Sequence, residues 1–223
     1  MILHLVSDRR RLAPGAEAEA AARCLLEQAR CAVAAGLDVI QLREPDLDGR
    51  SMVALGRALV RATRGSCTRI VINDRLDVAL AARADGLHLT AVSVDATAVR
   101  ACTRPGFLIG RSVHAPAEAA TAGPVDYLIA GAVWPTVSKP PGHQLLGEAG
   151  LGAVVAAAAV PVLAIGGVHV SHVARVAALG GSGVAAIGAW MGTAGACHAV
   201  PLADVAQSFR ESFAAGNMEP RLP

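Results

Sequence analysis

Residues that could do chemistry recur at one kind of position in this chain, directly after short apolar runs. They include amides, carboxylates, hydroxyls, an imidazole, cations and glycine turns, which are groups that enzymes use to bind anions and to move protons. The candidates are Gln41, Arg43, Glu44, Asn73, Asp74, Ser112, His114, Thr136, Lys139, Gly166, Gly167, Ile187 and Gly188. A cluster of this kind is more than a purely structural protein needs, so we expect an enzyme.

Arg43 and His114 have the clearest predicted roles. Gln41 and Arg43 alternate at the end of an apolar run, so both should point inward. An arginine there can bind a carboxylate or a phosphate through two parallel hydrogen bonds. Histidine is the side chain that most often serves as a general acid–base, which makes His114 the best candidate for that role, with a structural histidine as the alternative. His169 and His172 are expected to be exposed rather than metal-ligating.

The apolar runs that must position these residues are predicted to be strands. Their length and their Val and Ile content are typical of strands buried on both faces of a parallel sheet. They are Ile2–Val6, Asp38–Leu42, Arg69–Ile72, Gly86–Leu89, Phe107–Gly110, Val125–Ile129, Pro161–Ile165 and Gly183–Ile187. Segments of helical length alternate with them: Ala16–Ala35, Gly49–Thr63, Leu76–Arg83, Ala96–Thr103, Pro116–Ala122, Glu148–Ala158, Ser171–Leu179 and Leu202–Ala214.

This alternation predicts the fold. Eight strand–helix units in 223 residues indicate an α/β protein, a single-domain (β/α)8 TIM barrel. We expect the barrel domain over residues 1–215 and a loose tail over residues 216–223. An open doubly wound sheet is the alternative, but the first strand is followed by Ser7-Asp8-Arg9-Arg10 and not by a glycine-rich loop. Ser171 is predicted to cap a helix.

Two glycine turns indicate where a phosphate would bind. Gly166-Gly167 and Gly188 follow the last two predicted strands, which is the recurrent phosphate position of such barrels. Glycine lets the backbone approach an anion, and N–H groups at a helix start can donate to its oxygens. A plain tight turn is the alternative for the glycine pair. His88 is expected to fill the barrel or to contact the ligand.

Charge and hydropathy exclude several classes of function. Lys and Arg number 20 against 18 Asp and Glu, a net charge of +2, and no basic run marks a nucleic-acid or membrane partner. The five cysteines never have C-x-x-C spacing, which argues against a zinc knuckle. The N-terminus has no signal-peptide pattern, and the longest apolar stretch is too short to span a membrane. We therefore expect a cytoplasmic protein.

Several segments carry a resemblance to a known family. They are Val-Ile-Gln-Leu-Arg-Glu (39–44), Ile-Asn-Asp-Arg-Leu-Asp-Val-Ala-Leu (72–80), Ala-Asp-Gly-Leu-His-Leu (84–89), Ile-Gly-Arg-Ser-Val-His (109–114), Asp-Tyr-Leu-Ile-Ala-Gly-Ala-Val-Trp-Pro-Thr-Val-Ser-Lys (126–139), Val-Pro-Val-Leu-Ala-Ile-Gly-Gly-Val (160–168) and Gly-Val-Ala-Ala-Ile (183–187). In order and spacing these segments resemble the thiamine phosphate synthase/TenI family. The resemblance implies a (β/α)8 barrel that handles thiazole phosphate in thiamin biosynthesis.

The family pattern separates two activities. A synthase joins a pyrimidine pyrophosphate to a thiazole phosphate using Mg²⁺, and its pattern has a lysine and a metal-binding aspartate at positions where this chain has Pro45 and Ser93. Because pyrophosphate departure needs cations and Mg²⁺ needs hard oxygen ligands, their loss favours the other activity. That activity is a metal-independent thiazole tautomerase, an isomerase that aromatises a carboxythiazole phosphate. The synthase with Mg²⁺ is the first alternative, and a non-catalytic thiazole or thiamin phosphate binder is the second.

The tautomerase interpretation assigns roles by resemblance. His114 would move the proton, Arg43 would hold the substrate carboxylate, and Glu44 would orient Arg43 or the backbone. Gly166, Gly167, Ile187 and Gly188 would bind the phosphate, and Gln41, Asn73, Ser112, Thr136 and Lys139 would contact the substrate. No metal or other cofactor is expected, with Asp74 as a ligand only in a synthase and Asp95 as a weak substitute for the missing aspartate. The expected partner is a small phosphorylated thiazole, and the resemblance implies a homo-oligomer. Whether Trp134 stacks on a substrate or packs against the protein is left open.

Overall fold

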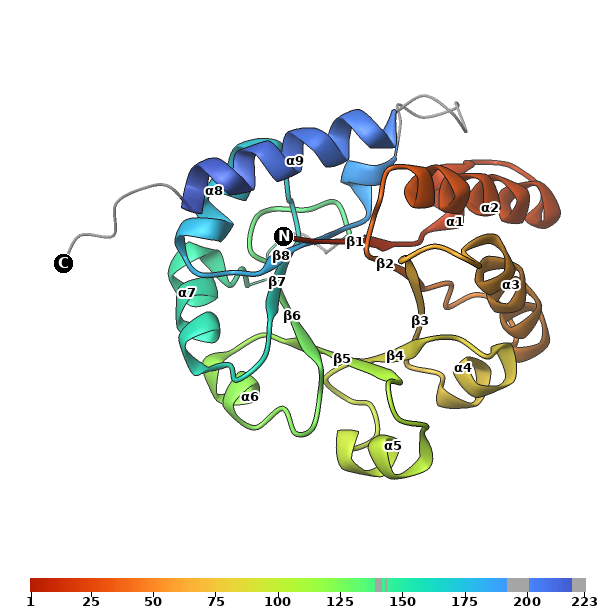
Figure 1. The fold of residues 1–223 in the computed structure, drawn as a ribbon, viewed down its shortest axis with the longest axis horizontal. Helices are drawn as coiled ribbons and strands as arrows, with labels where there is room; N and C mark the ends of the chain where they lie inside the picture. The colour runs from red at the N-terminus through yellow and green to blue at the C-terminus, as the bar shows by residue number, and fades with distance from the viewer. Residues whose placement is uncertain (139–141, 143, 192–200, 218–223) are drawn as a thin grey trace.

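The chain forms a closed barrel of parallel strands surrounded by helices. The computed structural model describes residues 1–138, 142, 144–191 and 201–217. The strands follow one another around the barrel from β1 to β8, and β8 pairs with β1 to close the sheet. Helices ring the outside of this sheet, as Figure 1 shows in a view into the barrel. The predicted single-domain (β/α)8 barrel is therefore confirmed.

The elements alternate along the chain, as predicted. The strands are β1 (Ile2–Val6), β2 (Val39–Leu42), β3 (Arg69–Asn73), β4 (Gly86–Leu89), β5 (Leu108–Val113), β6 (Tyr127–Gly131), β7 (Val162–Ile165) and β8 (Gly183–Ala186). The helices are α1 (Arg9–Leu12), α2 (Ala18–Ala34), α3 (Gly49–Ala62), α4 (Leu76–Ala82), α5 (Ala96–Cys102), α6 (Pro116–Ala120), α7 (Gly147–Ala157), α8 (Val170–Ala178) and α9 (Leu202–Asn217), with a 3₁₀ turn η1 (Gly188–Trp190).

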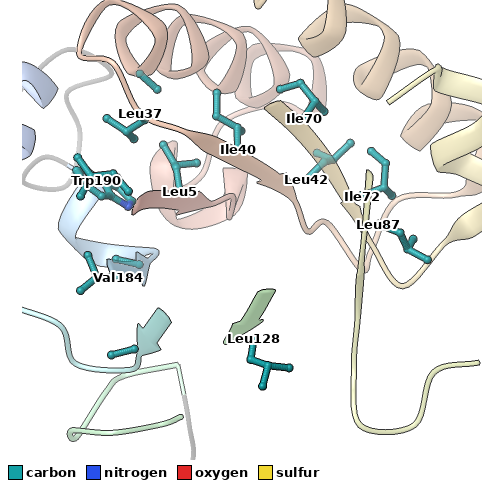
Figure 2. Close-up of a cluster of buried hydrophobic side chains, with 14 of the residues drawn as sticks. Leu5, Leu37, Ile40, Leu42, Ile70, Ile72, Leu87, Leu128, Val184 and Trp190 are labelled. Carbon is teal, nitrogen blue, oxygen red and sulfur yellow. The ribbon is translucent and has the colours of Figure 1, made fainter. Parts of the chain in front are cut away.

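The two faces of the strands form two separate layers. Successive side chains on a strand point to opposite faces, so every second residue packs outward against the helices. Figure 2 shows outward-facing Leu5, Ile40 and Ile72 in the larger apolar cluster, between sheet and helices. A smaller apolar cluster fills part of the barrel interior: Val6, Tyr127, Ile129, Leu163 and Ala185. Other interior positions carry buried polar side chains, among them His4, Gln41 and His88.

One interior position shows why a strand here needs glycine. A Cβ atom at Gly110 would lie 2.1 Å from Cζ of Tyr127, so only glycine leaves room for that ring inside the barrel. β5 also continues to Val113, past the predicted end at Gly110, because its pairing with β6 extends from Gly110 to Val113. Ser112 therefore lies within the strand and faces the interior.

Three features of the helices differ from the sequence prediction: an additional helix, one cap and one end. Helix α1 was not predicted; the Asp8 carboxylate caps it by accepting a hydrogen bond from the Arg11 backbone N–H at 3.1 Å. Ser171 lies inside α8 and does not cap it, since the cap residue is His169. Helix α9 runs to Asn217, past the boundary expected at residue 215. Gly216 is buried there because α9 lies beside α8 (Figure 1) and a Cβ would meet the Ala174 carbonyl.

The rest of the expected tail, residues 218–223, lies outside the described residues. In the part of the chain that the structure describes, no helix has the length and hydropathy needed to cross a membrane.

Candidate active site

A cavity of about 840 Å³ opens at the carboxyl ends of the strands. This is the end at which (β/α)8 barrels place their active sites. Most predicted site residues line it: Gln41, Arg43, Asn73, Ser112, His114, Thr136, Gly166, Gly167, Ile187 and Gly188. Residues from nearly every strand end thus meet in one space, because the barrel closes and brings together positions that are far apart in the sequence.

A hydrogen-bond chain inside the barrel fixes the orientation of two cavity amides. Nε2 of His4, on β1, lies 3.1 Å from Oε1 of Gln41, on β2. Nε2 of Gln41 in turn donates to Oδ1 of Asn73, on β3, at 2.9 Å. Because a carbonyl oxygen only accepts, His4 must donate from Nε2, and the chain leaves the Asn73 amide nitrogen as a donor at the cavity end. Nδ1 of His4 has no hydrogen-bond partner among the described residues.

A second buried histidine holds Ser112. Nε2 of His88 lies 2.9 Å from the Ser112 hydroxyl, and its Nδ1 lies 3.3 Å from the Tyr127 hydroxyl. Burial lowers the pKa of both His4 and His88 from 6.5 to about 3, and it raises the pKa of Tyr127. All three side chains are therefore neutral at neutral pH, so these three interior groups contribute dipoles and no charge. His88 lines the cavity, and its ring stacks on that of Tyr127, which fits both of its predicted roles.

His114 stands at the cavity with a defined tautomer. Its Nδ1 contacts the Gly131 carbonyl oxygen, so this nitrogen carries the proton and Nε2 is the acceptor. Its backbone N–H donates to the Glu118 carboxylate at 2.7 Å, at the start of α6. The side chain is exposed and lines the cavity. The arrangement leaves one basic nitrogen available to a ligand, as general acid–base chemistry requires.

Glu44 is not at the cavity, although Arg43 is. The buried Glu44 carboxylate accepts a 2.6 Å hydrogen bond from the Ser7 hydroxyl, and a 2.9 Å ion pair joins it to Arg9. The Ser7 hydroxyl also accepts a 2.9 Å hydrogen bond from the backbone N–H of Arg43. Glu44 therefore positions the backbone of Arg43 through Ser7. Arg9 also binds Asp46, and this hydrogen bond holds the pKa of Asp46 at about 2.

The Gly166-Gly167 turn packs against the loop that follows β6. Both residues have positive φ, at 95° and 62°. A Cβ at Gly166 would lie 2.6 Å from the Cβ of Ala132, and one at Gly167 would lie 2.3 Å from the Pro135 carbonyl oxygen. The turn therefore requires glycine for close packing whether or not a phosphate binds, so the predicted phosphate role stays a prediction.

The Asp74 carboxylate, the expected metal ligand of a synthase, is in contact with a hydroxyl group. The Ser93 hydroxyl contacts the Asp74 carboxylate, at the position where the family pattern has an aspartate. Asp95 caps α5 by accepting the Thr97 N–H at 3.1 Å, which commits it elsewhere. Within the described ranges, no group of three or more His, Cys, Asp or Glu residues could hold a metal ion. Lys139 lies outside the described residues.

Several cavity residues were not among the predicted site residues. Arg11 from α1, Asp204 and Ser208 from α9, and His169 also line the cavity. The Ser7-Asp8 pair before three arginines could have indicated a capped helix at the site, whereas nothing local in α9 shows that it reaches the cavity. Trp134 does not line the cavity. Its ring stacks on His172 with 4.2 Å between ring centroids, which settles its packing partner.

Fold and cavity together define a (β/α)8 barrel with an active-site-like cavity at the expected end. The family model described as thiamine monophosphate synthase matches residues 12–190. A thiamine-phosphate synthase of Methanoculleus marisnigri is 40% identical over 195 residues, which cover 86% of this chain and 90% of the relative. One of Moorella thermoacetica is 40% identical over 174 residues, covering 77% and 83%. This chain belongs to the thiamine monophosphate synthase family, a family of enzymes.

Solved structures agree with that membership. A thiamine phosphate pyrophosphorylase from Pyrococcus furiosus superposes with a TM-score of 0.77 at 29% identity, covering 97% of this chain and 96% of that one. A 3-hexulose-6-phosphate synthase superposes with a TM-score of 0.67 at 21% identity, which shows a shared fold.

These relatives overturn the tautomerase interpretation. Relatives that are 36–43% identical carry the name thiamine-phosphate synthase, the activity that the sequence analysis ranked second. The prediction of an isomerase was wrong because it gave two substitutions, Pro45 and Ser93, more weight than the retained site. The Ser93 hydroxyl still places an oxygen beside Asp74. Serine in place of aspartate therefore removes a negative charge but keeps an oxygen that can bind a metal.

Proposed function

We propose that this protein is a thiamine phosphate synthase, a transferase that joins a pyrimidine pyrophosphate to a thiazole phosphate with release of pyrophosphate. The observation that carries the proposal is the 40% identity to named thiamine-phosphate synthases across most of the chain. The cavity supports it, because its volume of about 840 Å³ falls within the range of roughly 300–1,000 Å³ that small-molecule sites occupy.

The reaction places specific demands on the cavity. The bond between the pyrimidine fragment and the pyrophosphate oxygen breaks, its electron pair leaves with pyrophosphate, and the thiazole forms the new bond to the pyrimidine fragment. Donors and cations must therefore be aimed at the charge that develops on the leaving oxygen. Arg43 at the end of β2 provides one such cation, and the Asn73 amide, oriented through Gln41 and His4, provides an uncharged donor.

The residues around Asp74 fit a magnesium ion that is shared with a substrate. Mg²⁺ is commonly held by one or two carboxylates, with substrate phosphates and water completing its octahedral shell. Asp74 would supply the carboxylate, and the Ser93 hydroxyl lies against it as a further hard oxygen donor. When bound, the ion would neutralise negative charge on the leaving pyrophosphate. Asn73, the residue before Asp74, lines the cavity, as does Thr90, whose hydroxyl lies 2.9 Å from that of Ser93.

The remaining expectations stay predictions. We propose a phosphorylated thiazole as the small-molecule partner and a homo-oligomer as the assembled form, and we predict no nucleic-acid or membrane partner. His114 in this reaction would serve as an acceptor for a donor group of the substrate, since its Nδ1 faces the Gly131 carbonyl and leaves Nε2 of the neutral ring as the acceptor. The predicted substrate contacts of Ser112, Thr136, Gly166, Gly167, Ile187, Gly188 and Lys139 carry over as proposals.

Turnover of the purified chain tests the function. The protein is incubated with pyrimidine pyrophosphate and thiazole phosphate, with Mg²⁺ or with EDTA, while thiamin phosphate and pyrophosphate are quantified. We expect equal amounts of both products with Mg²⁺ and a loss of turnover with EDTA. Failure to form thiamin phosphate at saturating substrates and Mg²⁺ would overturn the proposal.

A further inference from the structure

Three consecutive arginines follow β1, and they have different surroundings. The buried Arg9 pairs with Glu44 at 2.9 Å and with Asp46 at 2.5 Å, and the exposed Arg10 pairs with Asp46 at 2.9 Å. Arg11 forms no salt bridge with any described residue and lines the cavity. The run thus has two arginines that stabilise the β1–β2 loops and a third whose charge is left for another partner.

The structure holds Arg11 in place from both ends. Its backbone N–H donates to the Asp8 carboxylate at 3.1 Å, which fixes the start of α1. Its side chain reaches across the barrel opening, where the terminal nitrogen Nη1 donates to the Ser138 hydroxyl after β6 at 3.1 Å. The other terminal nitrogen, Nη2, lies 3.5 Å from the place that a Cβ on Gly188 would occupy. The guanidinium therefore lies between the loops after β6 and β8.

This placement leaves hydrogen-bond donors open to a ligand. A guanidinium has five N–H donors in a planar fork that matches the oxygens of a phosphate, and the Ser138 hydroxyl accepts from one nitrogen only. Glycine at position 188 keeps the space beside Nη2 clear of a side chain. Asp204 on α9 also lines the cavity, but no salt bridge joins it to Arg11 within the described residues.

We propose that Arg11 is an anion-binding residue of this cavity, which donates hydrogen bonds to the phosphate of the thiazole substrate. The proposal rests on the proposed synthase function for the identity of the anion, because Gly188, beside Nη2, is a proposed contact of that phosphate. No proton is transferred in this role, since arginine stays protonated at all working pH values.

Binding of thiazole phosphate tests the proposal without requiring turnover. Isothermal titration with thiazole phosphate, and separately with inorganic pyrophosphate and Mg²⁺, compares the wild type with Arg11→Gln, Arg11→Lys and the matched control Arg10→Gln, each checked for folding by circular dichroism. We expect Arg11→Gln to weaken the binding of thiazole phosphate by about tenfold or more, as the loss of a charge-assisted hydrogen bond implies. The affinity of Arg11→Lys should lie between those of the wild type and Arg11→Gln, because lysine keeps the charge without the planar fork of donors. Arg10→Gln should bind as the wild type does.

Three results would overturn the role of Arg11. They are unchanged binding of thiazole phosphate in Arg11→Gln, equal weakening in Arg10→Gln, and a loss in Arg11→Gln that affects pyrophosphate alone. Parallel turnover assays separate this proposal from the function itself. Arg11-dependent binding of thiazole phosphate without thiamin phosphate formation would refute the synthase and keep the anion-binding residue. Full turnover in Arg11→Gln with an unchanged KM for thiazole phosphate would keep the synthase and refute Arg11.

Discussion

The two faces of the same strands have opposite chemistry. Outward from the sheet, residues such as Leu5, Ile40 and Leu42 form a continuous apolar layer under the helices (Figure 2). Inward, their neighbours His4 and Gln41 belong to a hydrogen-bonded polar set that reaches the cavity. Adjacent residues on a strand thus have different roles, because one packs in the apolar layer and the next belongs to the polar set that reaches the cavity. The comparison indicates that the outer layer holds the barrel closed while the inner layer orients the site.

The largest effect is expected in the outer layer at Trp190. Its side chain is almost fully buried, packs on Phe209, and donates from Nε1 to the His4 carbonyl at 3.1 Å. Trp190→Ala should lower the free energy of unfolding in urea by about 3–5 kcal/mol, since it removes a large buried ring. Val92→Ala, at a side chain that is 93% exposed, is the control and should change little. A loss below about 1 kcal/mol at Trp190 would show that the outer layer does not determine stability.

A smaller loss of stability is expected when the buried carboxylate of Glu44 is replaced. Glu44→Leu removes a carboxylate that Ser7 and Arg9 both contact, leaving the buried Arg9 with Asp46 alone. We expect a destabilisation of about 3 kcal/mol, measured by urea unfolding. Turnover per folded molecule should also fall, because Glu44 positions the Arg43 backbone through Ser7. Wild-type stability and turnover would show that Glu44 is dispensable.

The inner layer should give a pH-dependent stability. The pKa values of His4 and His88 are about 3 in the folded protein and 6.5 in the unfolded chain. Above pH 6.5 both are neutral in either state; below it the unfolded chain binds protons that the folded protein excludes, so stability falls toward pH 3.

His4→Gln should remove one of these two contributions while keeping an amide near Gln41. The slope of unfolding free energy against pH should decrease by about 1.4 kcal/mol per pH unit between pH 6 and 4. Urea unfolding at several pH values measures it. An unchanged slope would mean that His4 is protonated in the folded barrel.

The sequence predicted the outer layer better than the site. Apolar runs such as Ile2–Val6 and Gly86–Leu89 are strands with the expected bounds, because burial on both faces requires a continuous apolar pattern. The short helix α1 was missed because its only local signal is the Asp8 cap. Arg11 was therefore not recognised as a cavity residue.

The site was predicted as a set of positions and not as a set of contacts. Strand ends converge in any closed barrel, so Gln41, Asn73 and Ser112 could be expected at one cavity. That Glu44 turns away to Ser7 and Arg9 depends on the α1 backbone, which the local sequence pattern does not reveal. The reaction was mispredicted because two substitutions were weighed without knowing that the Ser93 hydroxyl reaches Asp74.

Adjacent residues on β2 provide the most direct test of the comparison. Gln41 faces the cavity and Leu42 faces the helices, so Gln41→Leu and Leu42→Ala change one layer each. Unfolding free energy and pyrophosphate release per folded molecule are measured for both variants with pyrimidine pyrophosphate, thiazole phosphate and Mg²⁺. We expect Gln41→Leu to lose about tenfold or more in turnover and about 1–3 kcal/mol of stability through the unpaired His4 donor, and Leu42→Ala to lose about 2–5 kcal/mol with wild-type turnover. Equal turnover in the two variants would contradict the division of roles between the layers.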